Sequence, residues 1–209
     1  MKKLAAFALA VVVALAMTAC GGRDKDERET AVPAVSDVLV RSVYNEIDAS
    51  YYNSYTQLTV TPPGDWYVYT DNDLAMSFLG GKVTGDEFSM WSSADYKNRQ
   101  IIPDFAVMDM ANNNSLSVVY VNRKQLENAE HMDEDAVRSL IIQSMVDQGR
   151  ILQQRDEQLT LCGQEFRVLE FKGTDATRFF ATRIQDNYMI VITATDRSGA
   201  GAEMFFSFF

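Results

Sequence analysis

Short segments in which apolar and polar residues alternate recur along this 209-residue chain. In YTQLTVTPPGDW, residues 55–66, Leu58 and Val60 alternate with threonines, and a Pro-Pro-Gly turn follows. Residues 66–70 alternate again, and VLVRSVY, residues 38–44, is rich in β-branched residues. Successive side chains on a strand point to opposite faces of a sheet, so these patterns predict short strands.

Two other segments have the spacing of helices. Residues 70–79 begin with side chains that can cap a helix, and they place Leu74 and Phe78 four residues apart. The second segment has an acidic start at residues 133–135 and apolar residues three and four apart until Gly149. Acidic residues in the first turn and a glycine after the last turn are typical of helix boundaries. The sequence therefore predicts one short helix and one longer helix.

The last third of the chain is dense in strand patterns. Residues 105–111 and 116–122 flank three asparagines, which predicts a hairpin because asparagine tolerates positive φ. Four further strands are expected at residues 158–161, 165–171, 177–185 and 188–195. Cys162–Gly163 and Asp186–Asn187 mark tight reversals, so antiparallel pairing is expected. The last strand is apolar on both faces, which predicts a central place in a layered structure.

The remaining segments complete an α+β fold class. Residues 82–103 have little pattern and predict a long loop. GAEMFFSFF, residues 201–209, predicts a short terminal helix whose phenylalanines are buried. Together these elements predict a single globular domain at residues 37–209, with an antiparallel β-sheet flanked by helices.

The N-terminus has the features of an export signal. Lys2 and Lys3 precede an apolar run at residues 4–16, which is shorter than the roughly 20 residues that span a bilayer. We therefore assign residues 1–19 to a signal peptide. The sequence MTAC that follows resembles the lipobox of bacterial lipoproteins, in which small residues precede a lipidated cysteine. Cys20 is accordingly the predicted point of lipidation.

The segment after Cys20 is polar and charged. GGRDKDERETAVPAVSD has no hydrophobic periodicity, so residues 20–36 are predicted to form the lipidated cysteine and a flexible tether. Several acyl chains hold a protein at a membrane because each buried CH₂ contributes about 0.8 kcal/mol. We expect a lipid-anchored protein on the outer face of the bacterial cytoplasmic membrane, or in the outer membrane if the source has one.

The order of the predicted elements resembles a known family. YNSYTQLTVTPPGDWYVYTDNDL and FAVMDMANNNSLSVVYVN, followed by the longer helix, LTLCGQEFRVLEF and NYMIVITATD, are similar in order to the PsbP-like, or Mog-type, α/β/α sandwich. This fold occurs in many small bacterial lipoproteins of unassigned function. The resemblance implies an antiparallel sheet flanked by helices. It implies no single activity, because the family ranges from photosystem accessory subunits to a Ran-binding import factor.

Composition excludes several classes of function. Only 19 basic residues oppose 29 acidic ones, for a net charge of −10, so binding to nucleic acid is not expected. The chain has a single histidine, His131, which argues against a zinc site. Asp71 and Asp73 begin like a calcium loop, but the later ligand positions are missing, and helix capping is the better interpretation. We predict no metal and no cofactor.

No catalytic arrangement emerges from the sequence. His131 lies in the charged segment NAEHMDED, and no serine motif accompanies it. Cys162 lies at a predicted hairpin turn with no base nearby in sequence, and we expect it to be a small turn residue and not a nucleophile. The two cysteines are not expected to pair, because Cys20 ends the signal. The protein is therefore predicted not to be an enzyme.

Aromatic residues provide the remaining candidate site. A groove for a ligand or partner could be lined by aromatic rings, which contribute large contact areas. The same rings could instead form the core beneath the long loop, and this is the interpretation that the sequence favours. Asp109 interrupts an apolar strand and is either at an exposed edge or a buried carboxylate with a partner. The candidate groove residues are Trp66, Tyr67, Tyr69, Phe88, Trp91 and Asp109.

These observations favour a membrane-tethered, non-enzymatic binding or accessory module that acts on a protein partner. The alternative is a carrier or sensor of a small ligand held beside the aromatic loop. A cavity of roughly a few hundred Å³ beside Trp66 and Trp91 would favour this alternative.

Overall fold

The computed structural model describes residues 36, 38–79, 99–126 and 131–209. The predicted signal peptide, Cys20 and nearly all of the tether lie outside these residues, as does most of the predicted loop. Among the residues described, no helix is both long and apolar enough to cross a membrane.

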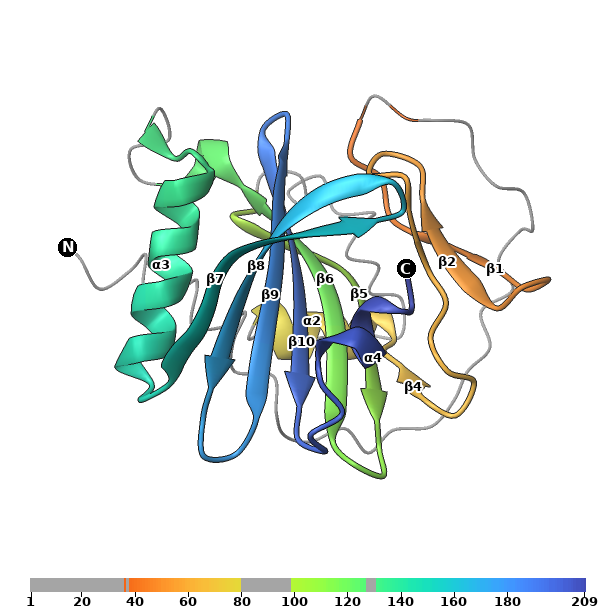
Figure 1. The fold of residues 1–209 in the computed structure, drawn as a ribbon. Coiled ribbons are helices and arrows are strands. Elements are labelled where there is room, and N and C mark those ends of the chain that lie inside the picture. Colours follow the sequence, from red (N-terminus) through yellow and green to blue (C-terminus); the bar gives the residue numbers. More distant parts are fainter. Residues whose placement is uncertain (1–35, 37, 80–98, 127–130) are drawn as a thin grey trace.

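A seven-stranded antiparallel sheet forms the centre of the fold, with the strand order β4-β5-β6-β10-β9-β8-β7 (Figure 1). Its strands are β4 (Tyr67–Val68), β5 (Ile101–Asp109), β6 (Asn114–Asn122), β7 (Ile151–Leu161), β8 (Gln164–Lys172), β9 (Thr177–Gln185) and β10 (Tyr188–Asp196). Every neighbouring pair is antiparallel. Short turns join β5 to β6, β7 to β8, β8 to β9 and β9 to β10, whereas α2 lies in the long connection between β4 and β5.

A second, three-stranded antiparallel sheet lies to one side of the main sheet (Figure 1). It consists of β1 (Val43–Asn45), β2 (Ser50–Asn53) and β3 (Leu58–Val60). Its turns contain Ala49 and Gln57 at positive φ, which lets short strands reverse within a few residues. The buried Leu58 and Val60 face the core, as the alternating pattern predicts.

Helices cover both faces of the main sheet. The helices are α2 (Asp71–Leu79), α3 (Glu134–Asp147) and α4 (Ala202–Phe206), with a 3₁₀ turn, η2, at Arg123–Gln125. Figure 1 shows α4 in front of the sheet and α2 behind it. On β9, Phe179 packs against α4, whereas Thr182 contacts Arg138 of α3. These two β9 residues are an odd number of positions apart, so α3 and α4 lie on opposite faces. The predicted α+β fold class is confirmed.

Strand β10 occupies the middle of this arrangement. It pairs with β6 on one side and with β9 on the other, and all of its residues after Tyr188 are buried. Both faces of the strand are therefore covered, as its apolar pattern predicts. The C-terminal helix also follows the prediction, since Phe205, Phe206 and Phe208 are buried.

The helix and turn signals are confirmed by local geometry. Thr70 and Asp73 form a reciprocal cap on α2, with the Thr70 amide donating to the Asp73 carboxylate at 2.8 Å. Asp133 caps α3 by accepting from the Ala136 amide at 2.8 Å. In the predicted hairpins, positive φ occurs at Asn113, Cys162, Gly163 and Asp186.

Three strand boundaries differ from the prediction. Of residues 38–44, only Val43 and Tyr44 belong to a strand. The predicted loop ends earlier, because β5 begins at Ile101. Strand β7 begins at Ile151 and not at Gln158, and its register shifts twice against β8. Such bulges interrupt the alternation of side chains between the two faces of the sheet. The polar first part of this edge strand therefore has no strand pattern in the sequence.

Candidate functional site

A groove of about 800 Å³ lies beside the small sheet. One wall is formed by residues 41–51 of the β1–β2 hairpin and its approach, and the other by residues 62–70, which lead into α2. Asp104 and Phe105 of β5 also line it, as does Met110 in the β5–β6 turn. We call this feature the aromatic groove.

The β1–β2 wall is organised by two tyrosines. Tyr44 and Tyr51 are direct cross-strand partners, and their ring centroids are 4.9 Å apart. Tyr51 in turn packs on Phe105 at 4.5 Å. Cross-strand aromatic pairs stabilise a short hairpin, so this contact chain fixes the hairpin against the main sheet. It also lines the groove with aromatic rings from the β1 wall to β5.

The opposite wall contains Trp66, which belongs both to the groove and to the core. The turn at Pro63 positions it, since the Trp66 amide donates to the Pro63 carbonyl at 3.0 Å. Its ring meets Phe208 edge-on at 5.2 Å and Phe205 at 6.1 Å. The side chain is half-buried. It therefore packs against the C-terminal phenylalanines and also forms part of the groove wall.

Tyr67 and Tyr69 continue this wall, with ring centroids 5.8 Å apart. The Tyr67 hydroxyl donates to Asp73 at 2.7 Å, and burial together with this bond raises the Tyr67 pKa to about 12. Burial also raises the pKa of Tyr69, with the charge of Asp73 adding to the effect. Both phenols therefore stay neutral near pH 7 and serve as apolar surface and hydrogen-bonding groups.

Beside these aromatic rings lies a buried carboxylate, Asp104, which is 3% exposed. It accepts hydrogen bonds from the Ser42 amide at 2.7 Å and the Ser42 hydroxyl at 2.6 Å. The Tyr120 hydroxyl donates at 2.7 Å and the Asn53 amide group at 3.1 Å. Buried carboxylates are tolerated when donors surround them, so this network holds the approach to β1 against β5.

The charges that line the groove are predominantly negative. Among the described residues that line the groove, Arg41 is the single basic one, and it is ion-paired with Asp71 through a hydrogen bond of 2.6 Å. Glu46, Asp65 and Asp104 contribute three carboxylates to the lining. An occupant that carries positive charge therefore fits the groove better than an anion does.

The predicted site residues are distributed as follows. Trp66, Tyr67 and Tyr69 line the groove, whereas Phe88 and Trp91 lie outside the described residues. Asp109 is half-exposed and is not among the lining residues.

Asp109 instead organises the β5–β6 turn. Its carboxylate accepts from the Ala111 amide at 2.9 Å and from the Asn112 side chain at 2.8 Å. The hydrogen bond from Asn112 is the main reason why the Asp109 pKa is lowered.

Sequence reasoning missed Asp104, Tyr44 and Tyr51. Asp104 stands in IIPDFAV, the start of an otherwise apolar strand, and an acid in such a place is the signal that could have found it. In the structure, the register between β5 and β6 shifts between Pro103 and Phe105, which is where Asp104 lies. The two tyrosines belong to a hairpin whose strands are too short for a clear periodic pattern.

His131 and Cys162, the two residues considered for catalysis, are not among the residues that line the groove. His131 is exposed before α3. Cys162 is exposed at the β7–β8 turn, where its sulfur accepts from the Thr59 amide at 3.3 Å. Within the described ranges, no group of three His, Cys, Asp or Glu side chains is placed to hold a metal ion.

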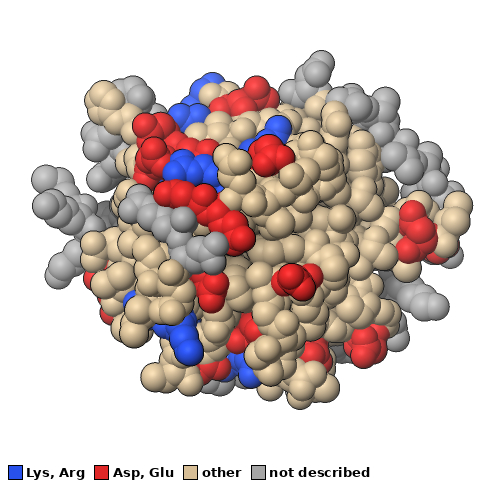
Figure 2. Space-filling view, in the orientation of Figure 1, with Lys and Arg blue, Asp and Glu red and all other residues tan. Residues whose placement is uncertain are grey.

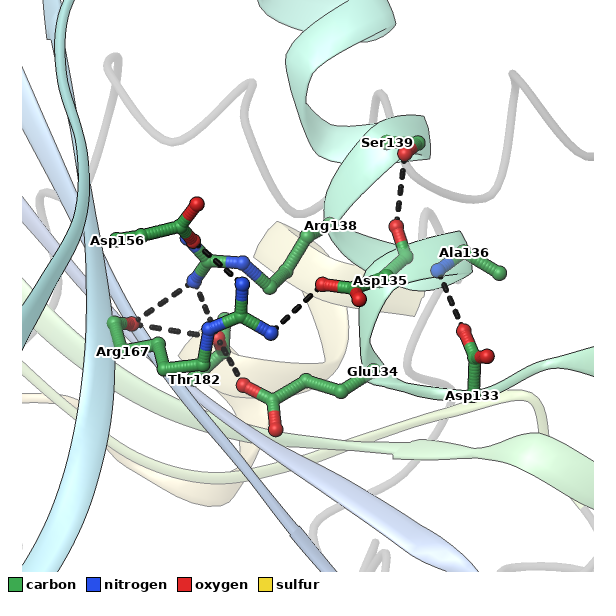
Figure 3. Close-up of polar contacts among 9 residues, drawn as sticks. All are labelled: Asp133, Glu134, Asp135, Ala136, Arg138, Ser139, Asp156, Arg167 and Thr182. Atoms are coloured by element: carbon green, nitrogen blue, oxygen red, sulfur yellow. Dashed lines mark hydrogen bonds and ion pairs between the residues drawn. The ribbon is translucent and has the colours of Figure 1, made fainter.

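A separate charged cluster fastens α3 to the sheet (Figure 3). Arg138, fully buried on α3, donates to Asp156 at 2.6 Å, to Thr182 at 2.9 Å and to the Arg167 carbonyl at 3.1 Å. The Arg167 side chain bridges Asp156 and Asp135, with both bonds at 2.6 Å. In Figure 2, acidic and basic side chains gather at the upper left, over the N-terminal end of α3, while much of the rest of this face is uncharged. The mixed signs and mutual pairing identify this cluster as a packing contact.

Comparisons with known proteins find likeness among solved structures. No family model matches the chain, and no curated protein sequence matches it. Among solved structures, the chain is similar to the solution structure of cyanobacterial PsbP (CyanoP) from Synechocystis sp. PCC 6803. The identity is 12% and the TM-score is 0.37, over 80% of this chain and 86% of that one.

Proposed function

We propose that this protein is a lipid-anchored, extracytoplasmic binding module that holds a segment of a protein partner in the aromatic groove and catalyses no reaction. The observation that carries the proposal is the groove itself, with a volume of about 800 Å³ and aromatic side chains on both walls. Tyrosine and tryptophan are enriched where proteins bind partners, because they combine large contact area with hydrogen-bonding capacity.

The charge of the groove indicates the kind of segment. With Arg41 already paired to Asp71, the carboxylates of Glu46 and Asp65 favour a partner segment that carries Lys or Arg. A cation over an aromatic face gains further attraction, about 0.5–2 kcal/mol. An extended basic segment is therefore the occupant that best matches these groups.

The proposed lipid anchor determines where the binding module acts. A signal peptide at residues 1–19 and lipidation of Cys20 would hold the domain at a membrane surface through the polar tether. Mass spectrometry of the mature N-terminus tests this part. Diacylglyceryl-modified Cys20 as the first residue is the expected result, and an unmodified N-terminus elsewhere would remove the anchor from the proposal.

A small ligand is the second candidate occupant, because the groove volume lies within the range of roughly 300–1,000 Å³ typical of small-molecule sites. The same carboxylates and rings favour a cationic small molecule, such as one with an ammonium group. This candidate makes the protein a carrier or sensor.

Site-specific crosslinking distinguishes the two candidates. A photoreactive amino acid at Tyr44, in the groove wall, is compared in intact cells with the same amino acid at Gln143, an exposed position on α3. A protein adduct that forms at position 44 and not at position 143 supports the partner hypothesis. Adducts at both positions or at neither argue against it. In the latter case, a small molecule recovered with the wild-type chain and lost from Tyr44→Ala supports the second candidate.

A further inference from the structure

Three arginines surround one carboxylate at the end of the main sheet where the β8–β9 turn and the segment after β10 lie (Figure 1). Arg150 precedes β7, Arg178 is the second residue of β9, and Arg197 follows β10. The carboxylate is Asp175, in the turn between β8 and β9. The cluster carries two positive charges in excess, although the chain as a whole has a net charge of −10.

Arg150 and Asp175 are paired with one another. Arg150 donates to both Asp175 oxygens, at 2.9 and 3.2 Å, and to the Ala176 carbonyl at 3.0 Å. A Cβ on Gly173 would lie 2.4 Å from Arg150 Nη1 and 3.1 Å from the Ala176 carbonyl oxygen, so a larger residue here would displace the Arg150 side chain. Arg197 approaches the second Asp175 oxygen at 3.8 Å. The single carboxylate of the cluster is thus already engaged.

Arg178 is different, because its guanidinium makes no hydrogen bond to any residue that the structure describes. The residue is 5% exposed, and its Nε and Nη1 atoms are buried without a partner. Buried guanidinium groups are almost always paired, because desolvation of an uncompensated charge is strongly unfavourable. Burial lowers the Arg178 pKa to about 10; the charge of Arg150 and, more weakly, that of Arg197 add to this effect, and Asp175 opposes it.

Asp196, on the neighbouring strand β10, is a second carboxylate near Arg178, and it is also in use. Asp196 accepts from the amides of Ser198 and Gly199 at 2.9 Å, and from the Gly201 amide at 2.8 Å. These bonds fold the segment that leads into α4. Asp196 therefore organises its own loop, and it makes no hydrogen bond to Arg178.

We propose that Arg178, Arg150 and Arg197 form a binding site for a dianionic oxyanion of the phosphate type. The guanidinium fork matches the spacing of phosphate oxygens, and a dianion balances the two excess positive charges, which a single carboxylate would not do. Arg178 supplies the buried donors of the site. Arg197 is partly exposed, with 26% of its side chain accessible, and provides the approach from solvent. This site is independent of the aromatic groove.

Thermal unfolding of the purified full-length chain in rising inorganic phosphate tests the proposal. At constant ionic strength, phosphate is expected to raise Tm progressively, because a ligand that binds only the folded state stabilises it. Chloride at the same ionic strength serves as the reference. A Tm that responds to phosphate no more than to chloride overturns the proposal.

Variants separate binding from folding. Arg178→Met and the more conservative Arg178→Lys are expected to weaken phosphate binding roughly tenfold or more, since neither retains the guanidinium fork. Arg178→Met should leave the Tm without phosphate unchanged or higher, because it removes a buried charge without a partner. A purely structural arginine would instead lower Tm equally with and without phosphate, and that result also overturns the proposal.

Two further arms complete the experiment. Lys124→Met removes one positive charge at an exposed position elsewhere and should bind phosphate as the wild type does. Arg197→Met, which perturbs the core least, should weaken binding. If it does not, the site as proposed is wrong. Glycerol phosphate, used beside inorganic phosphate, distinguishes a phosphorylated molecule from the free ion, because only an open site accepts the ester.

Discussion

The Tyr120 hydroxyl donates a hydrogen bond to the Asp104 carboxylate across 2.7 Å, next to the aromatic groove. Tyr120 lies on β6 and Asp104 on β5, and both are buried. The same carboxylate binds Ser42, just before β1, so it joins the main sheet to the chain that enters the small sheet. The geometry of the groove therefore depends on a polar contact between the two sheets.

Replacement of Asp104 by Ala is expected to lower the free energy of unfolding by about 3 kcal/mol. The change leaves the Ser42 amide, the Ser42 hydroxyl and the Tyr120 hydroxyl without their buried acceptor. Urea denaturation of the purified chain measures it. Asp65→Ala, at an exposed position of the groove lining, should stay within about 0.5 kcal/mol of the wild type. Equal stability of the two variants would contradict the assigned role of Asp104.

Trp66 and Tyr44 lie on opposite walls of the groove and should respond differently to replacement by Ala. Trp66→Ala is expected to cost about 2–3 kcal/mol of stability, because its ring packs on Phe205 and Phe208. Tyr44→Ala should cost about 1 kcal/mol, since it loses mainly the pair with Tyr51. Urea denaturation measures both values.

The two variants also test the groove as a binding surface. A partner that occupies the groove should lose affinity for both, although their stabilities differ. Retained affinity in Tyr44→Ala would count against the groove, because this variant stays folded.

Local signals in the sequence were sufficient for most elements of the fold. The reciprocal cap of Thr70 and Asp73, the Asp133 cap and the turn at Asn113 each depend on neighbours within a few residues. Because the interacting residues are close together in the sequence, their pattern can be recognised there. The two helices and the β5–β6 hairpin were therefore predicted correctly. Strand β7 was only partly predicted because its register shifts are set by pairing with β8 and not by its own pattern.

The candidate site was harder to predict because its contacts are distant in sequence. Trp66, Tyr67 and Tyr69 belong to one aromatic run, which is why they could be chosen together. The acid in IIPDFAV is visible in the sequence, but the partners of Asp104 became known only when the fold brought Ser42, Asn53 and Tyr120 around it. The same holds for Arg178, whose environment is built from three separate turns. Hydrophobic periodicity along the sequence does not predict such long-range polar contacts.

Arg138 and Asp156 should show an asymmetry when each is neutralised. Asp156→Asn is expected to cost about 3 kcal/mol or more, because the fully buried Arg138 then lacks its carboxylate. Arg138→Met should cost less, because Asp156 is partly exposed and keeps its bond to Arg167. Asn is the suitable replacement, since Asp156 has a φ of 62° and asparagine tolerates this conformation.

Urea denaturation of these two variants and of the double variant measures the coupling between Arg138 and Asp156. Arg167→Met is the matched control, because it removes the more exposed arginine that bonds the same carboxylate. A larger loss from Arg138→Met than from Asp156→Asn would contradict the predicted asymmetry.

Stability should fall at high pH because of the tyrosines around the groove. Burial and the hydrogen bond to Asp73 raise the Tyr67 pKa to about 12 in the folded protein, whereas an unfolded tyrosine titrates near 10. Between these values the folded state retains a proton that the unfolded state loses. The stabilisation is therefore complete below about pH 10 and is lost as the pH rises toward 12.

Tyr67→Phe, measured by urea denaturation at about pH 9 and pH 11, should lose less stability over this interval than the wild type. Some loss will remain, because burial also raises the pKa values of Tyr55, Tyr69 and Tyr188. An unchanged slope in Tyr67→Phe would show that the Tyr67 proton is not held by the fold.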